Sequence, residues 1–124
     1  MSFVRAAIIM ALLLASITPA TAQQSERTIV VWSFGFSPQP IALAAGEPVT
    51  LVFQNRSGRG HDFTAKAFFQ SSSITSGAAP DGEIELRPHE TKRITLVPRA
   101  GSYKAHCSHF MHAMLGMSDQ ILVR

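Results

Sequence analysis

Short apolar segments separated by proline and glycine constrain the fold of this chain more than any other feature. Within several segments apolar residues recur at the two-residue period of a β-strand, as at Val49, Leu51 and Phe53. Turn-forming residues, such as the pair Gly46 and Pro48, stand between the segments. Strands are predicted over residues 28–34, 40–44, 49–53, 83–86, 93–97, 103–107 and 118–123.

About seven to eight short strands with almost no helical periodicity favour an all-β fold, an antiparallel sandwich or barrel. The exception is a short helix or loop insertion expected around residues 66–82. There Phe68 or Phe69 would anchor one or two helical turns, and a run rich in Ser, Gly, Ala and Pro follows.

Residues 1–22 have the pattern of a secretory signal peptide. Arg5 precedes an apolar stretch, and Ala20-Thr21-Ala22 offers small residues at a cleavage site. The stretch is short for a membrane span, and an uncleaved N-terminal anchor is the alternative. Residues 23–124 are then expected to form a single soluble domain, a monomer in the periplasm or outside the cell.

The charge of the chain gives little support to nucleic-acid binding. Its formal net charge is +3, from 11 Lys and Arg against 8 Asp and Glu, and no basic cluster stands out. The sequence has neither a Gly-rich phosphate loop nor a serine between nucleophile-elbow glycines. An enzyme is not expected, because the chain is short and has too few histidines for a second or trinuclear metal site.

The chain has one cysteine, Cys107, which can form no internal disulfide. In an oxidising compartment a lone thiol is expected to be buried and inert, paired between chains, or bound to a metal. A buried core residue is the plainest interpretation. Three of the five histidines lie within five residues of Cys107, and this favours a metal.

The segment from Cys107 to Met117 places a thiolate, an imidazole and a thioether at even spacing, as Cys107-x4-His112-x4-Met117. Alternation along the preceding strand turns Cys107 inward and His106 outward. His61 follows a Gly-rich loop and is the best fourth ligand, whereas His89 lies in a Pro turn and is expected to be exposed. Two imidazoles, a thiolate and a weak axial thioether form the ligand set of a blue-copper electron-transfer site.

Two alternatives stay open for this segment. His109 offers a competing Cys-x-His pair, so it is a possible alternative or accessory ligand. In the second alternative, Cys107, Met114 and Met117 are core residues and the histidines are incidental.

Three segments resemble the cupredoxins, the group of small blue copper proteins that includes plastocyanin, azurin and pseudoazurin. They are residues 40–53, residues 55–63 and the segment from Ala100 to Met117. The resemblance implies a Greek-key β-sandwich with one copper ion at one end. By matching position it implies His61, Cys107 and His112 as equatorial ligands and Met117 as the axial ligand.

The ligand loop departs from the family in its spacing and in the presence of His109, which offers a competing Cys-x-His pair. Plastocyanins and pseudoazurins usually carry histidine three residues after the cysteine, where this chain has Phe110. The longer spacing to His112 is like that of azurin, but Met117 comes one residue later than azurin's methionine.

The resemblance implies a carrier of single electrons between redox partners, such as a cytochrome or a copper oxidoreductase. Apolar residues near His112 would form the docking surface; they are Phe110, Met111, Met114 and Leu115. The first alternative is a protein for copper sequestration, delivery or tolerance. It is suggested because the segment holds more copper-binding side chains than a site of four ligands requires, namely His106, His109, Met111 and Met114. A metal-free interaction domain is a lesser alternative.

Overall fold

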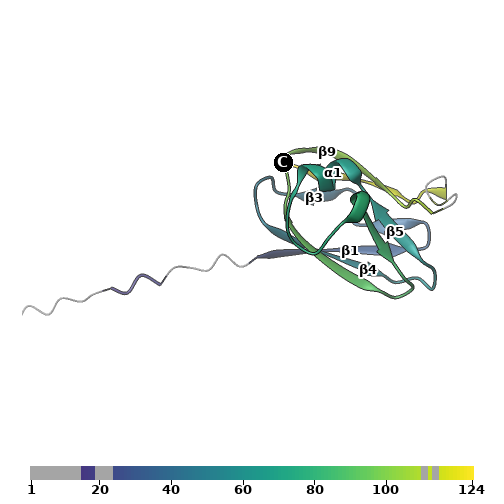
Figure 1. Ribbon diagram of the computed structural model, residues 1–124, viewed down its shortest axis with the longest axis horizontal. Coiled ribbons are helices and arrows are strands. Elements are labelled where there is room, and N and C mark those ends of the chain that lie inside the picture. The colour runs from purple at the N-terminus through teal and green to yellow at the C-terminus, as the bar shows by residue number, and fades with distance from the viewer. Residues whose placement is uncertain (1–14, 19–23, 110–111, 113–114) are drawn as a thin grey trace, which may run out of the picture.

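The computed structural model describes residues 15–18, 24–109, 112 and 115–124 of the chain. It shows two five-stranded sheets and one short α-helix (Figure 1). The first sheet has the order β2-β1-β4-β8-β6, and the second has the order β3-β10-β9-β5-β7. The strands of the first sheet are β2 (Gly35–Ser37), β1 (Ser25–Trp32), β4 (Val49–Asn55), β8 (Thr91–Val97) and β6 (Ser73–Ser76). Those of the second are β3 (Ile41–Leu43), β10 (Ser118–Val123), β9 (Gly101–His106), β5 (His61–Thr64) and β7 (Glu83–Leu86).

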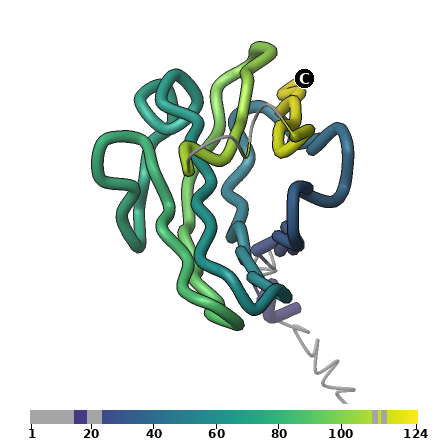
Figure 2. Tube along the Cα trace, turned by 90° about the vertical axis from the view of Figure 1, so that its right-hand side faces the viewer, coloured from purple at the N-terminus to yellow at the C-terminus, as the bar shows by residue number. Residues whose placement is uncertain are grey.

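Consecutive strands from β4 to β9 alternate between the two sheets, so the chain crosses the sandwich repeatedly (Figure 2). Most neighbouring strands are antiparallel, but β1 pairs in parallel with β4, and β3 pairs in parallel with β10. These crossovers are typical of a Greek-key sandwich. The predicted fold class is confirmed.

The two sheets enclose one apolar core, as the alternation of the sequence predicted. Phe53 on β4 and Phe63 on β5 are fully buried, and their ring centroids lie 4.9 Å apart across the sandwich. Phe36 meets Phe63 edge-on at 5.2 Å. His61 and Phe63 lie on the same face of β5, so the closely packed aromatic rings lie next to His61 and limit its movement.

The structure has more strands than the sequence predicted, ten in the described residues. The segment predicted as one strand over residues 28–34 begins earlier, at Ser25, ends at Trp32, and turns back into β2. The other additions are β5, in the second sheet, and β6, at the edge of the first sheet. All four residues of β6, Ser73 to Ser76, are exposed, so its sequence carries no alternation.

The expected insertion around residues 66–82 is confirmed. It contains helix α1 (Lys66–Ser71), β6 and the short helix η1 (Pro80–Gly82). Both Phe68 and Phe69 are buried, and they hold α1 against the core. Gly82 has φ +74°, and a Cβ atom there would lie 2.5 Å from the Cα atom of Lys66. Only glycine therefore fits where η1 meets α1.

Within the described ranges, none of the helices has the length and apolar character needed to cross a membrane.

Candidate metal centre

Three of the predicted ligands meet at one end of the sandwich. His61 is the first residue of β5, Cys107 directly follows β9, and His112 lies in the connection from β9 to β10. The Nδ1 atoms of His61 and His112 are 3.2 Å apart. The Cys107 Sγ atom lies 3.4 Å from Nδ1 of His112 and 4.0 Å from Nδ1 of His61. Residues far apart in the sequence thus present three donor atoms to a common point.

This triangle fits a single metal ion. Metal–nitrogen and metal–sulfur bonds of about 2.0 and 2.3 Å around one centre place the donor atoms about 3–4 Å from one another. All three distances between the donors fall in this range. One thiolate with two imidazoles is a donor set that copper favours.

His61 is suited to be a neutral ligand. Its side chain is fully buried, and burial, followed by the charge of His112, lowers the pKa of its imidazole. The ring is therefore unprotonated at neutral pH and can offer Nδ1 to a metal. Its Nε2 atom is buried without a hydrogen-bond partner in the described part of the chain.

Cys107 is fully buried, and burial raises the pKa of its thiol. Backbone N–H groups oppose this effect, and that of Asp62 lies 3.5 Å from Sγ. The thiol is thus protonated in the metal-free protein near neutral pH. A metal bound to Sγ would displace that proton, because the thiolate is the ligand.

Asp62 connects the segment that carries His61 to the segment that carries Cys107. Its buried carboxylate accepts a hydrogen bond of 2.8 Å from the backbone N–H of Ser108 and another from the Ser108 hydroxyl. It also accepts a bond of 2.9 Å from Thr64 Oγ1 on its own strand. Sequence reasoning missed this role, although the position of Asp62 directly after His61 could have suggested it.

A second buried polar residue shapes the loop before His61. The Asn55 side chain donates to the carbonyl oxygens of Arg59 at 2.7 Å and Arg87 at 2.9 Å. Its Oδ1 atom accepts from the backbone N–H and the hydroxyl of Ser57. These bonds satisfy both ends of the amide and fix the path of the chain into β5.

His109 lies outside the triangle. Its Nε2 atom is 3.0 Å from a Glu85 carboxylate oxygen and 3.7 Å from Asp62 Oδ2. It can nevertheless bring a donor atom within 4.8 Å of Asp62 and Cys107 donor atoms. His106 is exposed, as the strand alternation predicted, and so is His89.

Met117 is fully buried, and its backbone joins the two loop ligands. Its carbonyl oxygen accepts from the Cys107 N–H at 3.1 Å, and its N–H donates to the His112 carbonyl at 3.0 Å. These bonds draw the segment from Cys107 to Met117 into a closed loop. That Met117 supplies an axial sulfur stays a prediction.

The structure describes only part of the predicted docking surface. Phe110, Met111 and Met114 lie outside the described residues, whereas Leu115 is 55% exposed. The ring of Phe34 meets that of His112 edge-on. Sequence reasoning could not find this contact, because it joins distant parts of the chain.

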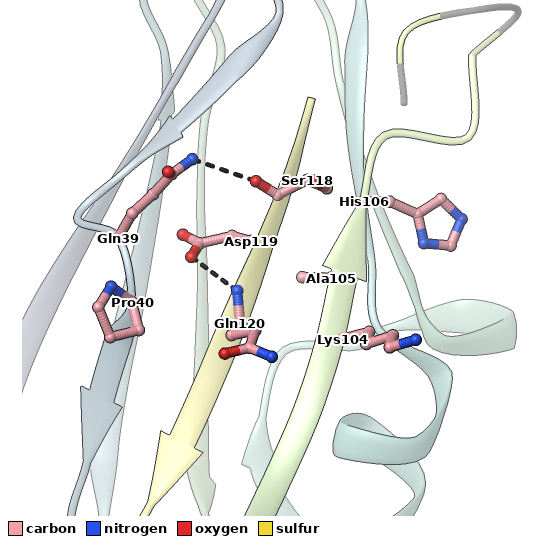
Figure 3. Close-up of a pocket in the computed structure, with 8 residues that line it drawn as sticks. All are labelled: Gln39, Pro40, Lys104, Ala105, His106, Ser118, Asp119 and Gln120. Carbon is pink, nitrogen blue, oxygen red and sulfur yellow. Dashed lines mark hydrogen bonds between the residues drawn. The ribbon is translucent and has the colours of Figure 1, made fainter. Parts of the chain in front are cut away.

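A surface cavity of about 640 Å³ lies over β9 and β10, and Gln39 and Pro40 complete its lining (Figure 3). None of His61, Cys107 and His112 lines it. Figure 3 shows Lys104 and His106 projecting to the same side of β9. The candidate metal centre is therefore separate from this cavity.

Comparison with models of protein families shows which family this chain belongs to. A family model described as a cupredoxin-like domain matches residues 4–117. The chain belongs to this cupredoxin-like family. The match begins within the predicted signal peptide, so it does not mark where the folded domain starts.

Solved structures share the fold at low sequence identity. A reduced auracyanin from Roseiflexus castenholzii has a TM-score of 0.62 and 17% identity, with 82% of this chain and 98% of that chain covered. Auracyanin A, a "blue" copper protein from Chloroflexus aurantiacus, has a TM-score of 0.56 and 20% identity, with coverage of 81% and 100%. A multicopper oxidase from Campylobacter jejuni has a TM-score of 0.62 and 15% identity; the match covers 86% of this chain and 31% of the oxidase. No curated protein sequence matches the chain significantly.

Proposed function

We propose that this protein binds one copper ion and carries single electrons between redox partners outside the cytoplasm. One observation supports the proposal above the others. Two imidazole nitrogens and a thiol sulfur, which belong to His61, His112 and Cys107, lie 3.2–4.0 Å from one another at the end of a rigid sandwich. These three residues would hold the copper, and Met117 would supply a weak fourth ligand.

Copper bound by thiolate, thioether and imidazole supplies one-electron exchange between Cu(I) and Cu(II). The chain's own residues keep the donors in place. Cys107 and His61 are fully buried, Asp62 ties their segments together, and the backbone bonds of Met117 close the loop. Donors that move little between two oxidation states favour rapid electron exchange. With four protein ligands no position remains for a substrate, which favours a carrier over an enzyme.

The partner is proposed to dock where His112 approaches the surface. His112 is half-buried, and the exposed side chain of Leu115 lies three residues further along the chain. Phe110, Met111 and Met114 are proposed to extend this apolar surface. A redox protein such as a cytochrome or a copper oxidoreductase is the expected occupant.

Reversible electrochemistry of the copper-loaded protein tests the carrier function. We expect one copper per chain and a reversible one-electron wave that repeated cycles leave unchanged. Cys107→Ser should abolish the wave because serine cannot supply the thiolate. An irreversible wave, or release of copper during cycling, would contradict the proposal.

Copper sequestration or delivery is the second candidate function. It is favoured by a second group of possible ligands, Asp62, Cys107 and His109, whose donor atoms all lie within 4.8 Å of one another. This group shares Cys107 with the proposed copper site. More than one copper per chain, or rapid transfer of copper to a chelator, would support this function against electron transfer.

A further inference from the structure

The hairpin between β1 and β2 places an aromatic ring beside the candidate metal centre. Trp32 pairs with Gly35, so the connection consists of only Ser33 and Phe34. The Trp32 ring lies against Gly35, where any added Cβ atom would overlap it. The tryptophan and the glycine together fix the shape of this turn.

Phe34 has an unusual backbone conformation. Its φ angle is +65°, in the left-handed region that glycine and asparagine tolerate and a bulky aromatic residue rarely adopts. Such a residue persists only where its surroundings hold it, and such positions cluster at functional sites. The contact that Phe34 makes therefore indicates what holds it in this conformation.

That contact is with His112. The two ring centroids are 5.3 Å apart and the planes meet at 83°, an edge-to-face arrangement. His112 directs Nδ1 toward His61 and Cys107, at 3.2 and 3.4 Å. Phe34 lies in the turn that joins β1 and β2 of the first sheet, whereas Cys107 follows a strand of the second. The contact thus braces the ligand loop against the other layer of the sandwich.

We propose that Phe34 is a positioning residue for His112: its ring fixes the plane of the imidazole and shields it from water, so that Nδ1 stays directed at the metal position. The inference rests on the proposed function for the identity of the metal. The ring contact can be measured in the metal-free protein, so the positioning role and the proposed copper binding can fail separately.

Three variants at this position separate the ring from the backbone conformation. Phe34→Gly and Phe34→Asn accept a positive φ and remove the ring, so the turn should persist and the metal-free protein should stay folded, because the relieved backbone strain offsets part of the lost ring contact. Phe34→Tyr keeps the aromatic edge. Among the copper-loaded proteins, Phe34→Gly and Phe34→Asn should release Cu(II) to EDTA at least about tenfold faster than the wild type. This is the lower end of the effect of replacing a residue that supports a metal ligand. Phe34→Tyr should release copper at close to the wild-type rate.

Ile74→Ala is the matched control, since Ile74 is an exposed apolar residue on β6, at the opposite edge of the same sheet. It should release copper at the wild-type rate. Wild-type rates in both Phe34→Gly and Phe34→Asn would overturn the proposal. Equal acceleration in Ile74→Ala or in Phe34→Tyr would also overturn it, because the effect would not then depend on this ring.

NMR of the metal-free protein supplies a readout independent of copper. Nuclear Overhauser contacts between the rings of Phe34 and His112 are expected, with a narrow set of His112 ring orientations that broadens in Phe34→Gly. If copper does not bind but these contacts appear, the proposed function fails and the positioning role stands. If the wild type lacks the contacts, the positioning role is wrong whatever metal binds.

Discussion

Asp62 is the residue on which the local order of the candidate site most depends. Its carboxylate is fully buried and accepts hydrogen bonds from the backbone and hydroxyl of Ser108 and from Thr64. Asp62→Ala would remove the acceptor of all three of these hydrogen bonds, which join a fully buried carboxylate to Ser108 and Thr64. We therefore expect a loss of about 2 kcal/mol in the free energy of unfolding of the metal-free protein, measured by urea titration.

Asp62→Asn is the control for this prediction. The amide oxygen can still accept from the Ser108 N–H, and the amide nitrogen can donate to the Ser108 hydroxyl. Its stability should stay close to that of the wild type. Equal losses in the Ala and Asn variants would mean that the charge, and not the hydrogen-bond geometry, stabilises this site.

The sequence indicated the ligands but not the residues that support them. Cys107, His112 and Met117 lie in one short segment, so their spacing was visible, and His61 stood out as a histidine beside a predicted strand. The contact of Phe34 with His112 joins the N-terminal hairpin to the last loop. Such a contact leaves no local pattern, because neither residue's neighbours in sequence reveal it.

At the scale of elements, the alternation rule succeeded wherever one strand face is buried and the other exposed. β8 and β7 show this pattern, with Ile94 and Leu96, and Ile84 and Leu86, directed inward. β5 could not be predicted as a strand, because all four of its residues are buried. β6 was missed for the opposite reason, since all of its residues are exposed.

The junction between η1 and α1 depends on Gly82. Gly82→Ala would add a Cβ atom 2.5 Å from the Lys66 Cα atom at a residue with φ +74°. Gly46→Ala is the matched control, because Gly46 has φ +75° and nothing within 4 Å of an added Cβ atom. We expect thermal unfolding to show a loss of about 1 kcal/mol for the control, from backbone strain alone, and a clearly larger loss for Gly82→Ala. Equal losses would contradict the close packing of η1 on α1.

The edge pair of β5 and β7 brings carboxylates together on the outer face of the second sheet. Asp62 pairs with Glu85, and Glu83 is the next residue on that face of β7. Burial, then a side-chain interaction with Glu85 and the charge of Asp62, raises the pKa of Glu83 to about 7 from 4.5. The folded state therefore binds a proton that the unfolded state releases between these two pH values.

This linkage predicts how stability changes with pH. Below about pH 4.5 Glu83 is protonated in both states and has no effect on stability; between pH 4.5 and 7 its contribution becomes increasingly unfavourable as pH rises. Glu83→Gln should thus match the wild type at pH 4 and be more stable at pH 8, as judged by urea unfolding of the metal-free proteins. A Gln variant less stable at pH 8 would contradict the raised pKa.

At the scale of the whole molecule, pairing of distant strands creates the candidate centre. Thr64 on β5 pairs with His106 on β9, and this antiparallel register carries His61 and Cys107 to the same end of the second sheet. The topology could be expected from the family resemblance but not from the strand pattern alone, which was equally compatible with a barrel.

Processing of the chain is a further prediction at this scale. If residues 1–22 are a signal peptide, export should leave a protein that begins at Gln23, two residues before β1 starts at Ser25. Intact mass measurement of the exported protein checks this directly. An N-terminus within β1, or the full-length mass, would contradict the predicted cleavage.

The proposal on which the carrier function depends is that His61, Cys107 and His112 hold one copper ion through a copper–thiolate bond. Its most direct test is the visible absorption spectrum of the purified protein during titration with Cu(II). We expect an intense copper–thiolate band that saturates at one equivalent and is absent from Cys107→Ser and His112→Ala. A copper-loaded wild type without that band, or a Cys107→Ser variant that keeps it, would contradict the proposed copper site.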